Sequence, residues 1–128
     1  MIEEQIVARL RAWPGLSALV GTRIYPAAAA PQNVQTPYIV YERRDSERVS
    51  TFAGDAGLVD LSFMLECFDV TRTGANAVRR EVRLALQRWK SPGIVRDSYI
   101  LSEADGPLDE KTRRFRGDVA VRVWAEDI

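Results

Sequence analysis

The stretch that decides the fold is Val59-Asp60-Leu61-Ser62-Phe63-Met64-Leu65-Glu66-Cys67, in which apolar residues alternate with more polar ones. Successive side chains of a β-strand point to opposite faces, so this period of two predicts a half-buried strand with one wetter face. The β-branched and aromatic residues 38–41, which follow Pro37, predict an earlier strand. The residues between the two strands predict a long antiparallel hairpin, with a tip at about 44–57.

A helix is expected on each side of this hairpin. The first covers residues 2–13 and stops at Pro14-Gly15, after which residues 16–20 add one more turn. Its apolar positions recur at helical spacing: Ile2, Ile6, Leu10 and Trp13. The second helix is predicted over residues 72–90. Its apolar face is formed by Val78, Val82, Ala85, Leu86 and Trp89.

Two further strands and one irregular segment complete the pattern. Residues 94–101 predict a less regular strand, and the final strand carries an apolar face of Phe115, Val119, Val121 and Val123. Gly117 interrupts that face, which indicates a bulge or a close backbone approach. Residues 26–37 are bracketed by prolines and predict an extended connecting arm, with an alanine-filled surface loop as the alternative.

The order α-β-β-α-β-β predicts an α+β fold with a mostly antiparallel four-stranded sheet and two main helices packed on one face. The spacing between the second and third strands would also allow one parallel pair. The chain of 128 residues has 46% apolar and 28% charged residues, which is typical of one globular domain. We therefore expect a single domain over residues 1–128.

The composition excludes much of enzyme chemistry. The chain has no His and a single Cys, so His-based catalysis, a His-containing zinc site and an internal disulfide are ruled out. Asp60 and Glu66 share a strand face but lie roughly 20 Å apart at about 3.3 Å per residue, too far for an acid–base pair. Cys67 is expected to be a small buried apolar residue. We expect no enzymatic activity, no metal and no cofactor.

The charge balance and the N-terminus bear on partners and location. Eighteen basic residues match eighteen acidic ones, so no whole-chain basic field for nucleic acid exists. No apolar run reaches the roughly 18 residues of a membrane span. The acidic start Met1-Ile2-Glu3-Glu4 shows no signal peptide, so we expect a cytoplasmic origin and no membrane partner.

The second helix carries the clearest charge feature. Residues 71–90 hold six basic residues and one acidic residue. Four of them form a candidate basic stripe opposite the apolar face: Arg72, Arg79, Arg83 and Lys90. The functional interpretation is contact with a phosphate backbone or an acidic partner, through charge rather than sequence-specific reading. The alternative is a solvated helix face.

Candidate contacts with another subunit or a partner come from the sheet and the hairpin tip. The strand 38–41 is apolar or aromatic on both faces, and Trp124 lies opposite the valine face of the last strand. Helices on one face leave the other to be covered by another subunit. At the tip, Phe52 is an aromatic anchor among small and polar residues. The candidate contact residues are Tyr41, Arg44, Arg48, Phe52 and Trp124.

Several segments together resemble the tail completion family of long-tailed bacteriophages and related gene transfer agents. The weight lies on residues 14–26, Pro-Gly-Leu-Ser-Ala-Leu-Val-Gly-Thr-Arg-Ile-Tyr-Pro, and on 37–41, Pro-Tyr-Ile-Val-Tyr. Supporting segments are residues 6–10, the helix through residues 82–86 and the strand from Arg114 to Trp124. The resemblance spans nearly the whole chain.

This resemblance implies a structural protein of the head–tail junction. Members of the family assemble into rings, typically sixfold, that cap the tail tube, end its growth and present a docking surface for the head. The implied partners are further copies of the chain in a hexamer, the tail tube protein, the head connector or adaptor protein, and DNA crossing the bore. The implied location is the host cytoplasm during assembly and then the particle tail.

A second hypothesis comes from the residues alone. The chain would be a small cytoplasmic α+β binding module that contacts nucleic acid or a protein partner through the basic face of its second helix. It predicts a monomer or dimer with salt-sensitive DNA binding, whereas the first hypothesis predicts self-association.

Overall fold

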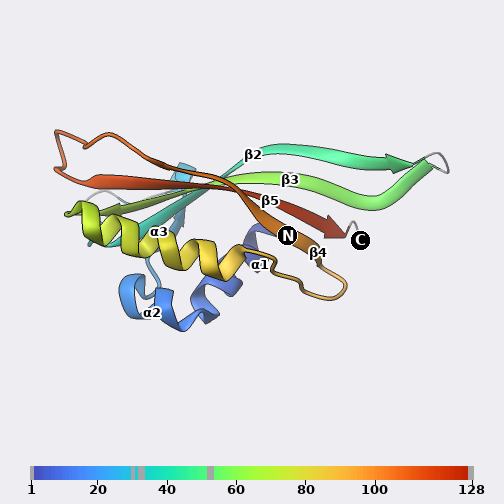
Figure 1. Cartoon of the computed structure of the whole chain (residues 1–128), viewed down its shortest axis with the longest axis horizontal. Coiled ribbons are helices and arrows are strands. Elements are labelled where there is room, and N and C mark those ends of the chain that lie inside the picture. Colours follow the sequence, from blue (N-terminus) through green and yellow to red (C-terminus); the bar gives the residue numbers. More distant parts are fainter. Residues whose placement is uncertain (1, 30, 32–33, 52–53, 127–128) are drawn as a thin grey trace.

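The computed structural model of the chain consists of a five-stranded sheet with helices on one face (Figure 1). The structure describes residues 2–29, 31, 34–51 and 54–126. The elements are α1 (Ile2–Ala12), α2 (Pro14–Val20), β1 (Ile24–Pro26), a 3-10 turn η1 (Ala27–Ala29), β2 (Tyr38–Thr51), β3 (Gly54–Asp69), α3 (Arg72–Leu86), β4 (Val95–Asp105) and β5 (Phe115–Glu126). Across the described ranges, no helix is long and apolar enough to cross a membrane.

The strands lie in the order β1-β2-β3-β5-β4. β1 runs parallel to β2, and the other neighbouring pairs are antiparallel. The predicted α+β class is confirmed, but the four-stranded antiparallel sheet and the order α-β-β-α-β-β are wrong in detail. β1 adds a fifth strand and supplies the parallel pair, which joins it to β2 and not the second predicted strand to the third.

The short strand β1 gave no signal because three residues cannot show a period of two. Its place is set by the residue before it. The amide of Ile39 donates to the carbonyl oxygen of Arg23 at 3.0 Å, and Nε of Arg23 donates to the carbonyl oxygen of Pro37 at 2.9 Å. One arginine therefore fastens the start of β1 to the start of β2.

The segment 26–37 is not an extended arm throughout, because Pro26 ends β1 and η1 follows it. Val34 packs with Tyr38 and Val40 in a small apolar cluster on the sheet face that the helices leave open. Arg114 holds this cluster in place: its guanidinium lies 5.2 Å from the Tyr38 ring and donates to the Val34 carbonyl at 2.8 Å. This end of the open face is thus covered by the chain itself.

The hairpin of β2 and β3 is as long as predicted. The ladder runs on to Thr51 and Gly54, with register shifts after Arg43 and after Val49. We call residues 44–51 and 54–57 the hairpin arm, which is the described part of the predicted tip. Figure 1 shows β2 and β3 running on past the helices. The arm therefore extends the sheet beyond the domain's own core.

α3 begins where the side chain of Thr71 accepts a hydrogen bond from the amide of Gly74 at 2.9 Å, an N-cap. It ends at Leu86 and not at residue 90, so the predicted helix was too long. Arg88 takes a positive φ of 56° and turns the chain, yet Trp89 remains buried. The apolar spacing continued past the helix end because Trp89 returns to the same core after the turn.

The core lies between the helix layer and one face of the sheet. The predicted packing partners Val78, Val82 and Leu86 of α3 share one buried cluster with Trp89 and the inward face of the sheet. The sheet residues of that cluster include Leu61, Phe63, Leu65, Val119, Val121 and Val123. Gly117 marks a close approach as predicted: a Cβ there would lie 3.2 Å from Cδ of Arg79 and 3.5 Å from the Ala75 carbonyl oxygen. The absence of a side chain lets α3 sit close to β5.

Candidate functional site

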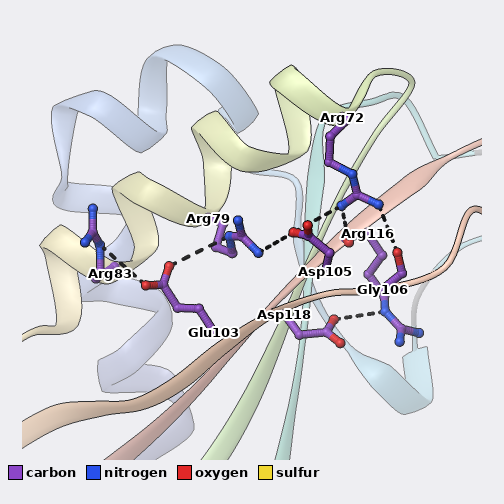
Figure 2. A network of polar contacts seen from close by, with 8 residues as sticks. All are labelled: Arg72, Arg79, Arg83, Glu103, Asp105, Gly106, Arg116 and Asp118. Atoms are coloured by element: carbon purple, nitrogen blue, oxygen red, sulfur yellow. Dashed lines mark hydrogen bonds and ion pairs between the residues drawn. The ribbon is translucent and has the colours of Figure 1, made fainter.

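Three arginines of α3 face two carboxylates of the edge strand β4, an arrangement that we call the arginine clamp (Figure 2). Arg79 lies at its centre: Nη1 is 2.7 Å from Oδ1 of Asp105, and Nε is 3.8 Å from Oε1 of Glu103. Nε of Arg83 lies 3.9 Å from Oε2 of Glu103. The side chain of Arg79 is only 18% exposed, so its pairing is less screened than that of an ordinary surface pair.

Arg72 completes the clamp at the start of α3. It donates to the carbonyl oxygens of Arg116 and Gly106, both at 2.9 Å, and its guanidinium lies 5.0 Å from the Phe115 ring. It also lies 3.5 Å from Asp105. Arg72 therefore fixes the end of β4 and the start of β5 to the helix, as Figure 2 shows.

The structure brings together three members of the predicted basic stripe and separates the fourth. Arg72, Arg79 and Arg83 turn towards β4, whereas Lys90 is exposed and lies beyond the end of α3. The sequence pattern did not predict this pairing, because Glu103 and Asp105 belong to the C-terminal half of β4, which runs past the predicted strand end at residue 101. The clamp joins a helix to an edge strand within one subunit.

Charge reversal at the centre of the clamp should destabilise the domain. Arg79→Glu would place three carboxylates side by side, and we expect the free energy of unfolding to fall by about 1–2 kcal/mol at low salt. The matched control is Arg80→Glu, one position along on the exposed side of α3, with an expected change of about 0.5 kcal/mol or less. Chemical denaturation with and without added salt measures both. An equal loss in the two variants would contradict the clamp.

The open face of the sheet carries ion pairs between β3 and β5. Nε of Arg122 lies 3.1 Å from Oδ1 of Asp60, and Nη1 of Arg116 lies 3.2 Å from Oε2 of Glu66. Arg116 also meets Asp118 at 2.9 Å, as an ion pair without the alignment of a hydrogen bond. Asp60 and Glu66 are therefore half-buried, and each is paired with an arginine of β5.

Two pKa shifts follow from these surroundings. Burial raises the pKa of the Glu66 carboxyl, and the nearby Arg116 works against that rise. A hydrogen bond with the Tyr99 side chain and the charge of Asp60 raise the pKa of the Arg122 guanidinium. The face is a set of paired charges and not a poised acid–base pair.

Trp124 and Tyr41, two predicted contact residues, lie on opposite faces of the sheet. Trp124 is half-buried on the open face, between Asp60 of β3 and Asp97 of β4, and its indole N–H finds no acceptor in the described part of the chain. Tyr41 is half-buried on the helix side, where it packs against the main core. The two residues therefore do not form one surface.

The remaining predicted contact residues belong to the hairpin. Arg44 and Arg48 are exposed on β2, and Nη2 of Arg44 lies 3.8 Å from Oε2 of Glu42. Phe52, the predicted anchor, lies outside the described residues. Residues 42–48 are all exposed, so side chains on both faces of this strand segment meet solvent.

Two hollows flank the sheet on its helix side. One of about 450 Å³ lies between α3 and β4 and is lined by Arg83, Leu84, Gln87 and residues 100–103. The other, of about 330 Å³, lies between α1 and β1. Its lining residues are Glu4, Val7, Ala8, Arg11, Ile24, Pro26 and Tyr41. Sequence patterns gave no sign of either hollow, because each joins elements that are distant in the chain.

Each hollow is lined by one carboxylate and one guanidinium among mainly uncharged side chains. Within the described ranges, no group of three or more Cys, Asp or Glu residues is placed to hold a metal ion. Cys67 is fully buried, and desolvation raises the pKa of its thiol far above the usual range. The thiol therefore stays protonated and has no access to solvent.

Cys67 should resist alkylation in the folded protein. We expect iodoacetamide to modify it only as the domain unfolds, since the residue is 0% exposed. Mass measurement after labelling with and without denaturant tests this. The control is Leu101→Cys at an exposed site, which should react at once under native conditions. Rapid labelling of the native wild-type chain would show that the β3 core opens readily.

Comparisons with known protein families and solved structures point to one class of protein. The family described as tail completion protein gp17 matches residues 4–126. A solved chain titled "Virion of native gene transfer agent (GTA) particle" shares the fold, with a TM-score of 0.75 and 24% identity. The match covers 94% of this chain and 91% of that one. No curated protein matches the sequence.

The family match covers nearly all of the described structure, including the helix layer and every strand of the sheet. It agrees with a molecule whose charged side chains pair with one another in the arginine clamp and on the open face of the sheet. The chain belongs to the tail completion protein gp17 family and is a structural component of a phage-type tail, not an enzyme.

Proposed function

We propose that the chain forms a ring at the head-proximal end of the tail tube, where it ends tube growth and joins the tail to the head. The observation that carries the proposal is the family match over residues 4–126. The ring is a hexamer of this chain that contacts the tube protein on one side and the head connector or adaptor on the other. DNA crosses its bore without sequence-specific contacts.

The shape of the subunit supports this function. The sheet ends in two edge strands, β1 and β4, which suit contacts between successive copies around a closed ring. The hairpin arm reaches beyond the domain's own core, where it is available to a neighbouring protein. These surfaces are therefore candidates for the contacts that a ring needs.

The second hypothesis, a binding module that uses the basic face of α3, finds less support. Arg72 and Arg79 are engaged by β4 and β5, and the Arg79 side chain is only 18% exposed. Their charges are offset by Glu103 and Asp105 of the same subunit. A field strong enough for salt-sensitive DNA binding needs uncompensated charge.

Removal of the gene from the particle-producing strain tests the proposal. We expect electron micrographs to show heads without tails and tails of irregular length, because neither tube growth nor joining would be completed. Complementation with the wild-type gene should restore joined particles of uniform tail length. Joined, uniform particles from the deletion strain would overturn the proposal.

A further inference from the structure

We propose that successive copies of the chain meet edge to edge, with the β4 side of one subunit against the α1–β1 side of the next. Leu84 and Leu101 of the first copy then cover the hollow between α1 and β1 of the second. This inference rests on the proposed ring and names the surfaces that would close it. It assigns the two hollows to one interface.

The two hollows lie at the same level of the sheet. The registers place Pro26 beside Tyr41, Tyr41 beside Leu65, Leu65 beside Val119, and Val119 beside Glu103. This single row begins in the hollow at β1 and ends in the hollow at β4. Copies placed side by side, without a shift along the strands, therefore bring one hollow against the other.

Both hollows also open on the same side of the sheet. Glu103 faces α3, since it pairs with Arg79 and Arg83, and Tyr41 packs against the core beneath the helices. Copies that keep their helices on a common side thus match α3 of one subunit with α1 of the next. This is a head-to-tail contact, the type that closes into a ring when each step adds the same rotation.

The strand directions permit the contact. β1 and β2 run one way, β3 the opposite way, β5 with β2, and β4 opposite to β5. A β4 edge placed beside the next copy's β1 and β2 is therefore antiparallel to both. Antiparallel approach of two open edges is favourable, because unpaired backbone groups on each can be satisfied.

Only part of β4 is open to such a partner. Its first half is covered from within the subunit: Ser91 bridges to Val95, the amide of Arg88 donates to the Ser98 carbonyl at 2.7 Å, and the Gln87 side chain accepts from the amide of Ile100 at 2.8 Å. Residues 101–105 have no such cover among the described elements and are all exposed. Within this free segment, residues 103–105 are level with β1, and residues 101 and 102 are level with the part of β2 that follows Tyr41.

The chemistry of the two surfaces matches. Leu84 and Leu101 are 43% and 45% exposed, and Leu101 is the extra residue at a register shift of β4. The opposing hollow is lined mainly by apolar side chains of α1 and β1. Each hollow is flanked by one carboxylate and one guanidinium, Glu103 with Arg83 and Glu4 with Arg11. Each of the two surfaces therefore carries one negative and one positive charge. The contact therefore buries two exposed leucines without burying an unpaired charge.

Cysteine cross-linking in purified particles tests the inference. The double variant Ala8→Cys/Leu101→Cys places one thiol on each surface, and both positions are exposed. Treatment with a short bis-maleimide should give covalent dimers and higher oligomers of this chain, whereas each single variant should give none. The buried Cys67 does not compete. The matched control is Ala8→Cys/Val70→Cys, since Val70 is 58% exposed but lies between β3 and α3.

The outcomes separate the inference from the proposed function. Variant chains that are present in particles and cross-link only as the 8/101 pair support the edge contact. Presence in particles without cross-links, or equal cross-links from the 8/70 pair, overturns the edge contact and leaves the ring proposal standing. Absence of the wild-type chain from purified particles would overturn the ring proposal itself.

A second variant tests the apolar contact without a cross-linking reagent. Leu101→Arg should keep the melting temperature of the purified chain, because the side chain is exposed, but reduce its incorporation into particles about tenfold. Leu101→Met is the matched control and should be incorporated normally. Normal incorporation of Leu101→Arg would overturn the contact at this leucine.

Discussion

Replacement of Leu65 by alanine is expected to lower the free energy of unfolding by about 2–5 kcal/mol. Leu65 is fully buried on the central strand β3, between Tyr41 of β2 and Val119 of β5, in the cluster that joins sheet and helices. The substitution removes buried apolar surface and leaves a cavity, because the close-packed side chains around it cannot move in to fill the space. Because a domain of this size is stable by about 5–15 kcal/mol, the loss is a large part of the total.

Leu84→Ala provides the matched control for that experiment. The chemical change is identical, but Leu84 is 43% exposed on α3 and lies outside the core cluster. We expect a loss of about 1 kcal/mol or less. Urea denaturation of both purified variants measures the difference. Similar losses from the two would show that β3 does not form the centre of the core.

Shortening the hairpin arm is expected to abolish head–tail joining while the subunit still folds. The register defines a clean deletion: removal of residues 50–55 takes out the last two pairs of the ladder and keeps Val49 opposite Leu58. Ala56 and Gly57 then form the two-residue turn, and Gly57 already has a positive φ of 73°. Pairing of β3 with β5, which begins at Leu58, is untouched.

Circular dichroism and thermal melting should show a folded subunit, and electron microscopy should show unjoined heads or tails of irregular length. A second variant keeps the length of the arm but replaces residues 50–55, including Phe52, with Gly and Ser. It distinguishes the effect of the arm's length from the effect of its side chains. Infectious or transducing particles at normal yield from the deletion would contradict a role for the arm in assembly.

The sequence predicted the elements whose own side chains make the core. β3 and the last strand alternate with a period of two, and α3 repeats its apolar residues with helical spacing, so local pattern and final burial agree. The hairpin followed from β3 and from the β-branched and aromatic strand that precedes it in the chain. The gap that Gly117 leaves in the valine face was likewise visible in the sequence, and of its two interpretations, a bulge or a close approach, the structure shows the close approach.

The elements that were missed depend on contacts between distant residues. β1 is held through Arg23 by Pro37 and Ile39, and no pattern within Ile24–Pro26 shows it. The helix end at Leu86 was hidden because Trp89 is buried by the chain turning back on the core. The arginine clamp needed the partner strand β4, whose register only the folded sheet defines.

The order of strands in the sheet has a consequence for synthesis on the ribosome. β3 gains its second neighbour only when β5 has been made, although it is itself complete some fifty residues earlier. Until then the edge of β3 that β5 will cover is unpaired, and the inward face shared with β5 is incomplete. Nascent chains interrupted before residue 115 thus lack β5 and the complete native sheet and should be removed by proteases, so incomplete subunits do not enter a growing particle.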